Sequence, residues 1–466
     1  MTLKCTTVLQ ATVFGLFLTM SPAVFATTLS DALIQAYQTN PALRVGRAGL
    51  RATDETVRQA KAAREPSVSG NIAATRIESP NPRIDTTPNT SASITASVPL
   101  YAGGTLILGV EQARLNVLST RQSLITTEQT VLFDAVTAFM DVRRDQRNVQ
   151  LARNSVKVLN EEVRAARERF EVGEVTRTDV AQAESRLAAS ESGLQTNIAA
   201  LQRAIDFYIA TVGSKPTNLR IPPVTPKLPS SANAAEAIAI ARHPSILQQQ
   251  FAVKAAEKSV AISKGNKSAV ISANAAVSRS NNNSTTFGGG VDKQTQGQIG
   301  LNLDQTIYNG GRLNSLERQA LAQLSQQKAN LQLAGVQVRQ NVHSIYATWT
   351  ASKATIIAGR KQVRAAKIAF DGASEEAKLG ARTTLDVLNS EQDLLQAQSD
   401  LVSAIRDEYV NAYGVLSAMG LLTVDHLGLG IESYDPDLNY KKVNGLNKFG
   451  QKRLKIFDKI MKLGGN

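Results

Sequence analysis

The chain has 466 residues, one cysteine and a formal net charge of +13. With Cys5 as its single cysteine, it offers neither a disulfide framework nor a cysteine-rich metal site. Much of the positive charge lies at the end, because from Lys441 onward there are eight Lys or Arg and one Asp. A short basic tail on an otherwise mildly basic chain is not typical of a nucleic-acid-binding surface, so we predict no nucleic-acid partner.

Residues 1–26 have the pattern of a secretory signal peptide. Lys4 supplies the positive start, Val8 to Leu18 the apolar stretch, and Val24-Phe25-Ala26 a small-residue cleavage site, so we expect cleavage after Ala26. The alternative, a membrane anchor, is disfavoured because the apolar stretch is too short to span a bilayer. No later uncharged apolar run reaches about 18 residues, so no transmembrane helix is expected.

Four segments alternate between apolar and polar residues and predict two β-hairpins, 67–98 and 268–304. The alternation is strict in Ser91 to Val98 and Gln296 to Leu303, and weaker in Ser67 to Ile77 and Ser268 to Arg279. The segments have 8 to 12 residues, close to the 9 to 11 that a tilted strand needs to cross a bilayer. On this pattern alone, ordinary hairpins on a soluble domain remain an alternative. The segments 78–90 and 280–292 are expected to be polar loops.

Two long segments, 104–172 and 311–379, contain no proline and predict very long helices. At 1.5 Å per residue, each would be roughly 100 Å long. Apolar residues recur every seven positions, which is typical of helices packed as in a coiled coil. Gly173 and Gly380 then reverse the chain into second helices, 176–212 and 383–420. The heptad positions are Ala135, Val142, Val149, Val156, Val163 and Phe170 in the first copy, and Leu388, Leu395, Val402 and Tyr409 in the second.

These features occur twice, which indicates an internal tandem duplication. Tyr101 and Tyr308 are 207 residues apart, and the same offset relates Gly173 to Gly380. We therefore predict a first repeat over 27–214, a proline-rich linker over 215–231, a second repeat over 232–422 and a basic tail over 423–466. Each repeat also contains a short helix, which opens at Asn40-Pro41 or His243-Pro244.

Four strands cannot close a membrane barrel, because an open sheet edge in lipid leaves backbone groups without hydrogen bonds. If these strands span a membrane, several chains must pool them. Two chains would give eight strands and three would give twelve.

The sharpest motifs are the strand-to-helix junctions and the two helix reversals, and together they resemble the TolC family of outer-membrane channel proteins over roughly residues 29–422. The junctions read Val98-Pro99-Leu100-Tyr101-Ala102-Gly103-Gly104 and Gln305-Thr306-Ile307-Tyr308-Asn309-Gly310-Gly311; the reversals read Val172-Gly173-Glu174-Val175-Thr176-Arg177-Thr178-Asp179 and Leu379-Gly380-Ala381-Arg382-Thr383-Thr384-Leu385-Asp386.

The resemblance implies a mixed α/β membrane protein, mainly α, in the outer membrane of a Gram-negative bacterium. Three protomers would share a twelve-stranded β-barrel that continues into a periplasmic α-barrel of long antiparallel helical hairpins. It also implies no cofactor and no catalysis. Periplasmic adaptor proteins and inner-membrane transporters of the RND or ABC type would deliver drugs or proteins to the channel.

Each helix reversal is followed by a carboxylate, Asp179 or Asp386. One interpretation is helix capping, with the nearby Thr178 or Thr384 as the cap. The resemblance implies another, a periplasmic gate formed by Asp179, Asp386 and Arg382. Asn389 and Ala377 depart from the family pattern, in which a second aspartate and an aromatic residue are common, so an incomplete lock is expected.

The same resemblance assigns the exposed tips to adaptor docking and the junctions to the passage from strand to helix. Tyrosine suits a membrane interface, and glycine allows the backbone to change direction. The docking residues are Gly173, Thr176, Arg177, Gly380 and Thr384; the junction residues are Pro99, Tyr101, Gly103, Gly104, Tyr308, Gly310 and Gly311.

The pattern disfavours two other classes of protein. An exported structural or adhesive coiled-coil protein without a pore would not need strands with one apolar face, and a periplasmic adaptor would need a lipoyl-like β-domain that the sequence does not show. An enzyme has no support, since His243, His343 and His426 lack metal-ligand spacing and no catalytic motif is present.

Overall fold

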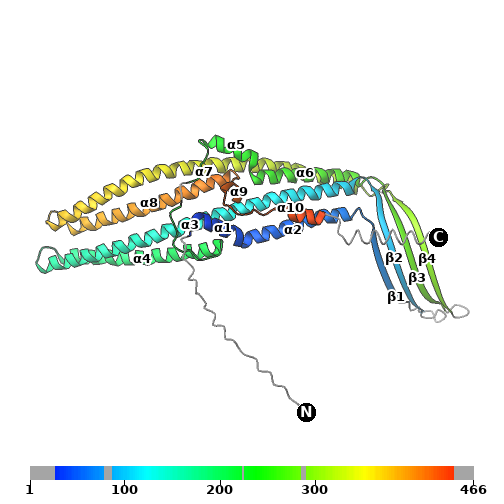
Figure 1. Cartoon of the computed structure of the whole chain (residues 1–466), viewed down its shortest axis with the longest axis horizontal. Helices are drawn as coiled ribbons and strands as arrows, with labels where there is room; N and C mark the ends of the chain where they lie inside the picture. Colours follow the sequence, from blue (N-terminus) through cyan, green and yellow to red (C-terminus); the bar gives the residue numbers. More distant parts are fainter. Residues whose placement is uncertain (1–26, 78–86, 223–224, 285–289, 445–466) are drawn as a thin grey trace, which may run out of the picture.

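The computed structural model describes residues 27–77, 87–222, 225–284 and 290–444. The predicted signal peptide with Cys5, the centres of the two hairpin loops and the tail beyond residue 444 lie outside the described residues. The chain is elongated, with a β-sheet at one end and the turns of two long helical hairpins at the other (Figure 1). Two short helices, two strands and two long helices follow one another, and the same order then repeats.

The long helices are as predicted to within one turn at each end. Helices α3 (Thr105–Glu171) and α7 (Arg312–Lys378) have 67 residues each, and α4 (Arg177–Val212) and α8 (Thr384–Ala418) run back along them. Four of the six predicted heptad positions of α3, Ala135, Val142, Val149 and Val163, are buried. Phe170, the last of the six, is 45% exposed.

Each repeat opens with two short helices, where the sequence predicted one. Helix α1 (Leu29–Thr39) precedes α2 (Pro41–Ala62), and α5 (Ala232–Arg242) precedes α6 (Pro244–Gly265). The break falls at Asn40 and at His243, which are extended because the following proline disfavours helical backbone. The side chains of these two residues then cap α2 and α6 by accepting backbone N–H groups.

The helices form parallel rows. Both α2 and α4 pack along α3, α6 packs between α3 and α7, and α8 also contacts both of these long helices. The main core lies at mid-length, where α1 and α5 cover this layer; it includes Phe139, Tyr208, Leu33, Leu132 and Leu416.

The strands β1 (Ser67–Ile77), β2 (Thr87–Ala102), β3 (Val270–Ser284) and β4 (Gly290–Asp304) form one antiparallel sheet in the order β1-β2-β3-β4. The predicted segments of 8 to 12 residues were too short for three of the strands, because β2, β3 and β4 have 16, 15 and 15 residues. Parts of the predicted loops belong to the ladder, as in the pair Asn89 and Asn282. Their polarity misled the prediction, since ladder hydrogen bonds use only the backbone.

The two faces of this sheet differ sharply in polarity. The register places Val68, Ile94, Val277, Ile299 and Leu301 on one face, and each of these side chains is exposed. The opposite face carries Ser69, Ser93, Thr95, Ser278, Gln296 and Gln298. Alternating side chains in registered strands therefore give one apolar and one polar surface.

The start of the tail is ordered, where the sequence showed no pattern after Thr423. Two short helices, α9 (Val424–Leu427) and α10 (Pro436–Asn444), follow, and α10 packs on α2. Arg121 Nη2 lies 2.7 Å from Asp437 Oδ1, and Asn439 Nδ2 donates to the buried Asp54 over 2.7 Å. Among the helices of the described ranges, none is both long enough and apolar enough to cross a membrane.

Candidate functional site

The two helical turns have nearly identical backbone geometry. Gly173 and Gly380 have φ angles of 81° and 75°, in the left-handed region that favours glycine. Each therefore ends its long helix and lets the chain reverse within a few residues. The two turns lie side by side at the end farthest from the sheet (Figure 1).

Each predicted gate carboxylate belongs to a capping box. Thr176 donates to Asp179 Oδ2 from its backbone N–H and its hydroxyl, both over 2.8 Å. Thr383 and Asp386 form the same pair, with distances of 3.1 and 2.8 Å. These hydrogen bonds from the threonines favour the ionised form and lower the pKa of both carboxyls. The capping interpretation is thus confirmed, and both carboxylates are ionised at neutral pH.

The caps are not the threonines we named. The prediction of Thr178 and Thr384 as caps is wrong. The capping hydroxyl accepts a hydrogen bond from the backbone N–H three residues later, so the caps of Asp179 and Asp386 are Thr176 and Thr383. Thr384 is the first residue of α8 and is only 5% exposed. Its hydroxyl has no hydrogen-bond partner within the described part of the chain. Thr384, which we predicted to be an exposed docking residue, is therefore buried at the start of α8.

The other predicted docking residues, Gly173, Thr176, Arg177 and Gly380, are exposed at the turns. Arg382 is also exposed, and its Nε lies 2.8 Å from Glu376 Oε2 rather than on Asp386. This hydrogen bond, followed by the nearby charges of Glu376 and Asp386, raises the pKa of Arg382. Arg382 is thus held within its own hairpin.

Ala377 is one of the two departures from the family pattern. Its side chain is buried between α7 and α8 with Ala373 and Val387. A methyl group therefore fills a gap in the packing of the turn, and it does not reach across to the other hairpin.

The structure identifies a cross-hairpin contact that the sequence did not. Arg186 Nη2 on α4 donates to Asn389 Oδ1 on α8 over 3.1 Å, and Arg186 Nη1 donates to Gln392 Oε1. These partners are 203 and 206 residues apart, so no local pattern could have paired them. Asn389, the other departure from the family pattern, is thus half of a link between the two hairpins.

The buried carboxyl of Glu391 lies next to this link, one residue before Gln392 on α8. Glu391 is 8% exposed, and burial raises its pKa while a hydrogen bond with Ser155 opposes the shift. Ser155 in turn shares a hydrogen bond of 3.2 Å with Ser190 on α4. Polar contacts therefore connect α3, α4 and α8 near the turns.

The junction residues lie where the sheet meets the helices. Pro99 and Tyr101 flank an irregularity in β2, and Gly103 and Gly104, with φ angles of 59° and 76°, lead into α3. At Gly103 a Cβ atom would lie 2.3 Å from the carbonyl oxygen of Gly265, so no side chain fits there. In the second copy Gly310 and Gly311 have φ angles of 64° and 80°, and Tyr308 beside them is exposed.

The histidines lie apart from these features. Within the described ranges no group of three or more His, Cys, Asp or Glu side chains is placed to hold a metal ion. His343 instead meets Glu236 on α5, with Nε2 and Oε2 2.7 Å apart. His243 caps α6, and burial lowers its pKa.

Sequence comparisons show the family of this chain. The model of the outer membrane efflux protein family matches residues 32–206 and 237–420. The chain is 36% identical to the outer membrane efflux protein BepC of Brucella suis, over 90% of this chain and 91% of BepC. It is 23% identical to the alkaline protease secretion protein AprF of Pseudomonas aeruginosa, over 58% and 57% of the two chains.

The fold matches solved outer-membrane channels. The Campylobacter jejuni channel CmeC superposes with a TM-score of 0.74 at 14% identity, covering 90% of each chain, and CusC gives 0.72 at 18% identity, covering 85% of this chain and 92% of CusC. The chain belongs to the outer membrane efflux protein family. It is a non-enzymatic outer-membrane protein of a Gram-negative bacterium, with a large periplasmic part.

Proposed function

We propose that three copies of this chain form an outer-membrane channel-tunnel, the passive exit duct of a tripartite efflux pump or a type I secretion system. The polarity of the sheet carries this proposal. Its apolar face is exposed on all four strands, its other face is polar, and within the described residues the outer edges of β1 and β4 are unpaired. A barrel closed by several chains would turn the apolar face to lipid, enclose the polar face and pair both edges.

The helices suit the same closure. The strands alternate with helical rows, since α2 leads into β1, β2 into α3, α6 into β3 and β4 into α7. Pairing β4 with β1 of the next protomer would bring α7 beside the next copy of α2 and α4. Three protomers would then give twelve strands and a continuous helical wall. The rival, an exported coiled-coil protein without a pore, does not account for the exposed apolar face.

We place the gate and the docking surface at the helical turns. Asp179 and Asp386 would form carboxylate rings near the axis, held by their threonine caps, with Arg382 beside them. Arg186 would tie the hairpins together above the rings. A periplasmic adaptor would contact the exposed turns, and an inner-membrane RND or ABC transporter would supply the cargo. The names of BepC and AprF refer to efflux and to protein secretion, so the relatives support either cargo class.

Photo-crosslinking in cells tests the docking surface. A probe at Arg177, which is exposed, should capture an adaptor from assembled trimers, whereas a matched probe at Gln250, exposed on α6 and remote from the turns, should not. Capture of a drug-pump adaptor would assign efflux, and capture of a type I adaptor would assign secretion. Trimers that capture no periplasmic protein from Arg177 would refute the docking surface, and a monomeric chain would refute the duct.

The gate has its own test. Replacing Asp179 and Asp386 with alanine should raise single-channel conductance and sensitise cells to large antibiotics, because both carboxylates and their caps are lost. Thr178→Ala, which alters an exposed residue of the same turn that does not cap, is the control. Unchanged conductance in the double variant would reject the gate.

A further inference from the structure

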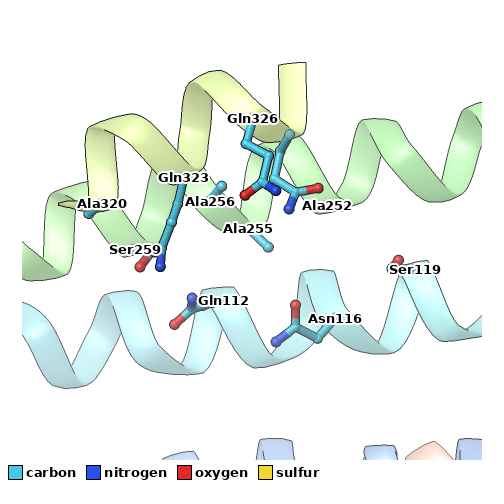
Figure 2. A pocket seen from close by; sticks show the side chains of 11 residues that line it. Gln112, Asn116, Ser119, Ala252, Ala255, Ala256, Ser259, Ala320, Gln323 and Gln326 are labelled. Atoms are coloured by element: carbon cyan, nitrogen blue, oxygen red, sulfur yellow. The ribbon is translucent and has the colours of Figure 1, made fainter. Parts of the chain in front are cut away.

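The helical layer contains a groove lined by carboxamides near its sheet end. A cavity of about 380 Å³ lies where α3, α6 and α7 meet. Figure 2 shows Gln323 and Gln326 of α7 and Gln112 and Asn116 of α3 around it, with alanines and Ser259 of α6 behind. None of the 11 lining residues is charged. This is a neutral site with many hydrogen-bonding groups.

The amides have unused hydrogen-bonding capacity. Across the described chain, the carboxamides of Gln112, Gln323 and Gln326 make no protein hydrogen bond. Each offers an N–H donor pair and a carbonyl acceptor. The small side chains of Ala252 and Ala256 leave space in the groove beside the amides, so a solute group can approach several amides at once.

The helical layer is covered on one face by α5 and the start of the tail, and the groove lies on its opposite face. On α3, Arg121 contacts Asp437 of the tail, and Ser119, which lines the groove, is two residues away and so about 200° around the helix. On α7, Arg339 and His343 contact Glu236 of α5, and Gln323 lies 20 residues before His343, about 160° around the helix.

A closed ring must carry these covering elements on its outside, because α5 and the tail would otherwise fill the bore. The uncovered face then lines the lumen. We propose that the three grooves of a trimer form an uncharged ring, the collar, in the lumen on the periplasmic side of the membrane. The collar binds the amide or hydroxyl groups of passing cargo, whatever the charge of that cargo. This inference rests on the proposed trimeric duct.

Sidedness of labelling tests the position of the collar. Gln323→Cys should react in intact cells with a bulky, membrane-impermeant maleimide, which enters through the barrel. Gln250→Cys is the matched control, on the opposite face of α6 and exposed; it should react only after the outer membrane is permeabilised. If both variants form trimers and both react only after permeabilisation, the collar is wrong and the duct stands. If the unsubstituted chain forms no trimer, the collar and the duct are both refuted.

Block of single channels tests the ligand class. The probe is an acetylated, amidated glycine–serine oligopeptide, whose groups are all amides and hydroxyls. Combining Gln323→Leu with Gln326→Leu should shorten its blocks about two- to tenfold for each hydrogen bond lost, with Gln250→Leu unchanged. Versions of the probe that contain one Lys or one Glu should block the unsubstituted channel for similar times. Equal blocks in the double variant, or a strong preference for one charge, would overturn the proposal.

Discussion

Replacing Arg186 with alanine removes a polar link between α4 and α8 near the turns. Arg186 Nη2 bonds Asn389 Oδ1 over 3.1 Å and Nη1 bonds Gln392, both at positions open to solvent. Solvent screening reduces such a link to about 1 kcal/mol per protomer, or roughly a fivefold change in an equilibrium. If three protomers open together, the open population rises on the order of a hundredfold.

Single-channel recording measures this change, and growth on a large antibiotic reports it in cells. The matched control is Arg167→Ala, which breaks a pair of similar exposure whose nitrogen and oxygen atoms are 2.6 Å apart, Arg167 with Glu184, inside one hairpin. We expect Arg186→Ala to open more often and Arg167→Ala to behave as the unsubstituted channel. Equal behaviour of the two variants would refute the assignment of Arg186 to the closed state.

Three further predictions concern the sheet, the caps and the tail. Lysine at Ile94 should impair trimer assembly more than lysine at Thr95, by about 2–4 kcal/mol at mid-membrane, as judged by trimer yield on gels; equal yields would reverse our orientation of the sheet. Thr383→Val should cost about 1 kcal/mol of unfolding free energy, through the lost cap. Thr384→Val should cost less, because its buried hydroxyl has no partner in the described structure, and urea denaturation would show the opposite order if Thr384 were the cap. Deleting residues 441–466 should leave the trimer intact, because Asp437 and Asn439 keep their contacts; a monomer would show that the tail is needed.

Much of the fold was predictable because it follows from local rules. Alternation with a period of two identified all four strands. Once the register was known, it also showed which residues lie on the apolar face of the sheet and which on the polar face. The absence of proline and the heptads predicted the long helices, while Gly173 and Gly380 marked their ends. The strand lengths were underestimated, since polar side chains do not interrupt a backbone ladder.

Contacts between distant segments could not be read in this way. The sequence identified Asp386 but not the exposure of Thr384, which depends on how α8 packs. It noted Asn389 only as a departure from the family pattern, and it gave no partner for it.

The sequence by itself thus determined which segments are strands, helices and turns, because periodicity and backbone preference act over a few residues. Only the tertiary structure decided that Arg186 meets Asn389, that α10 docks on α2, and that the amides of α3 and α7 share one groove. These pairings depend on the relative positions of whole helices, and packing fixes those positions over distances that no local pattern records.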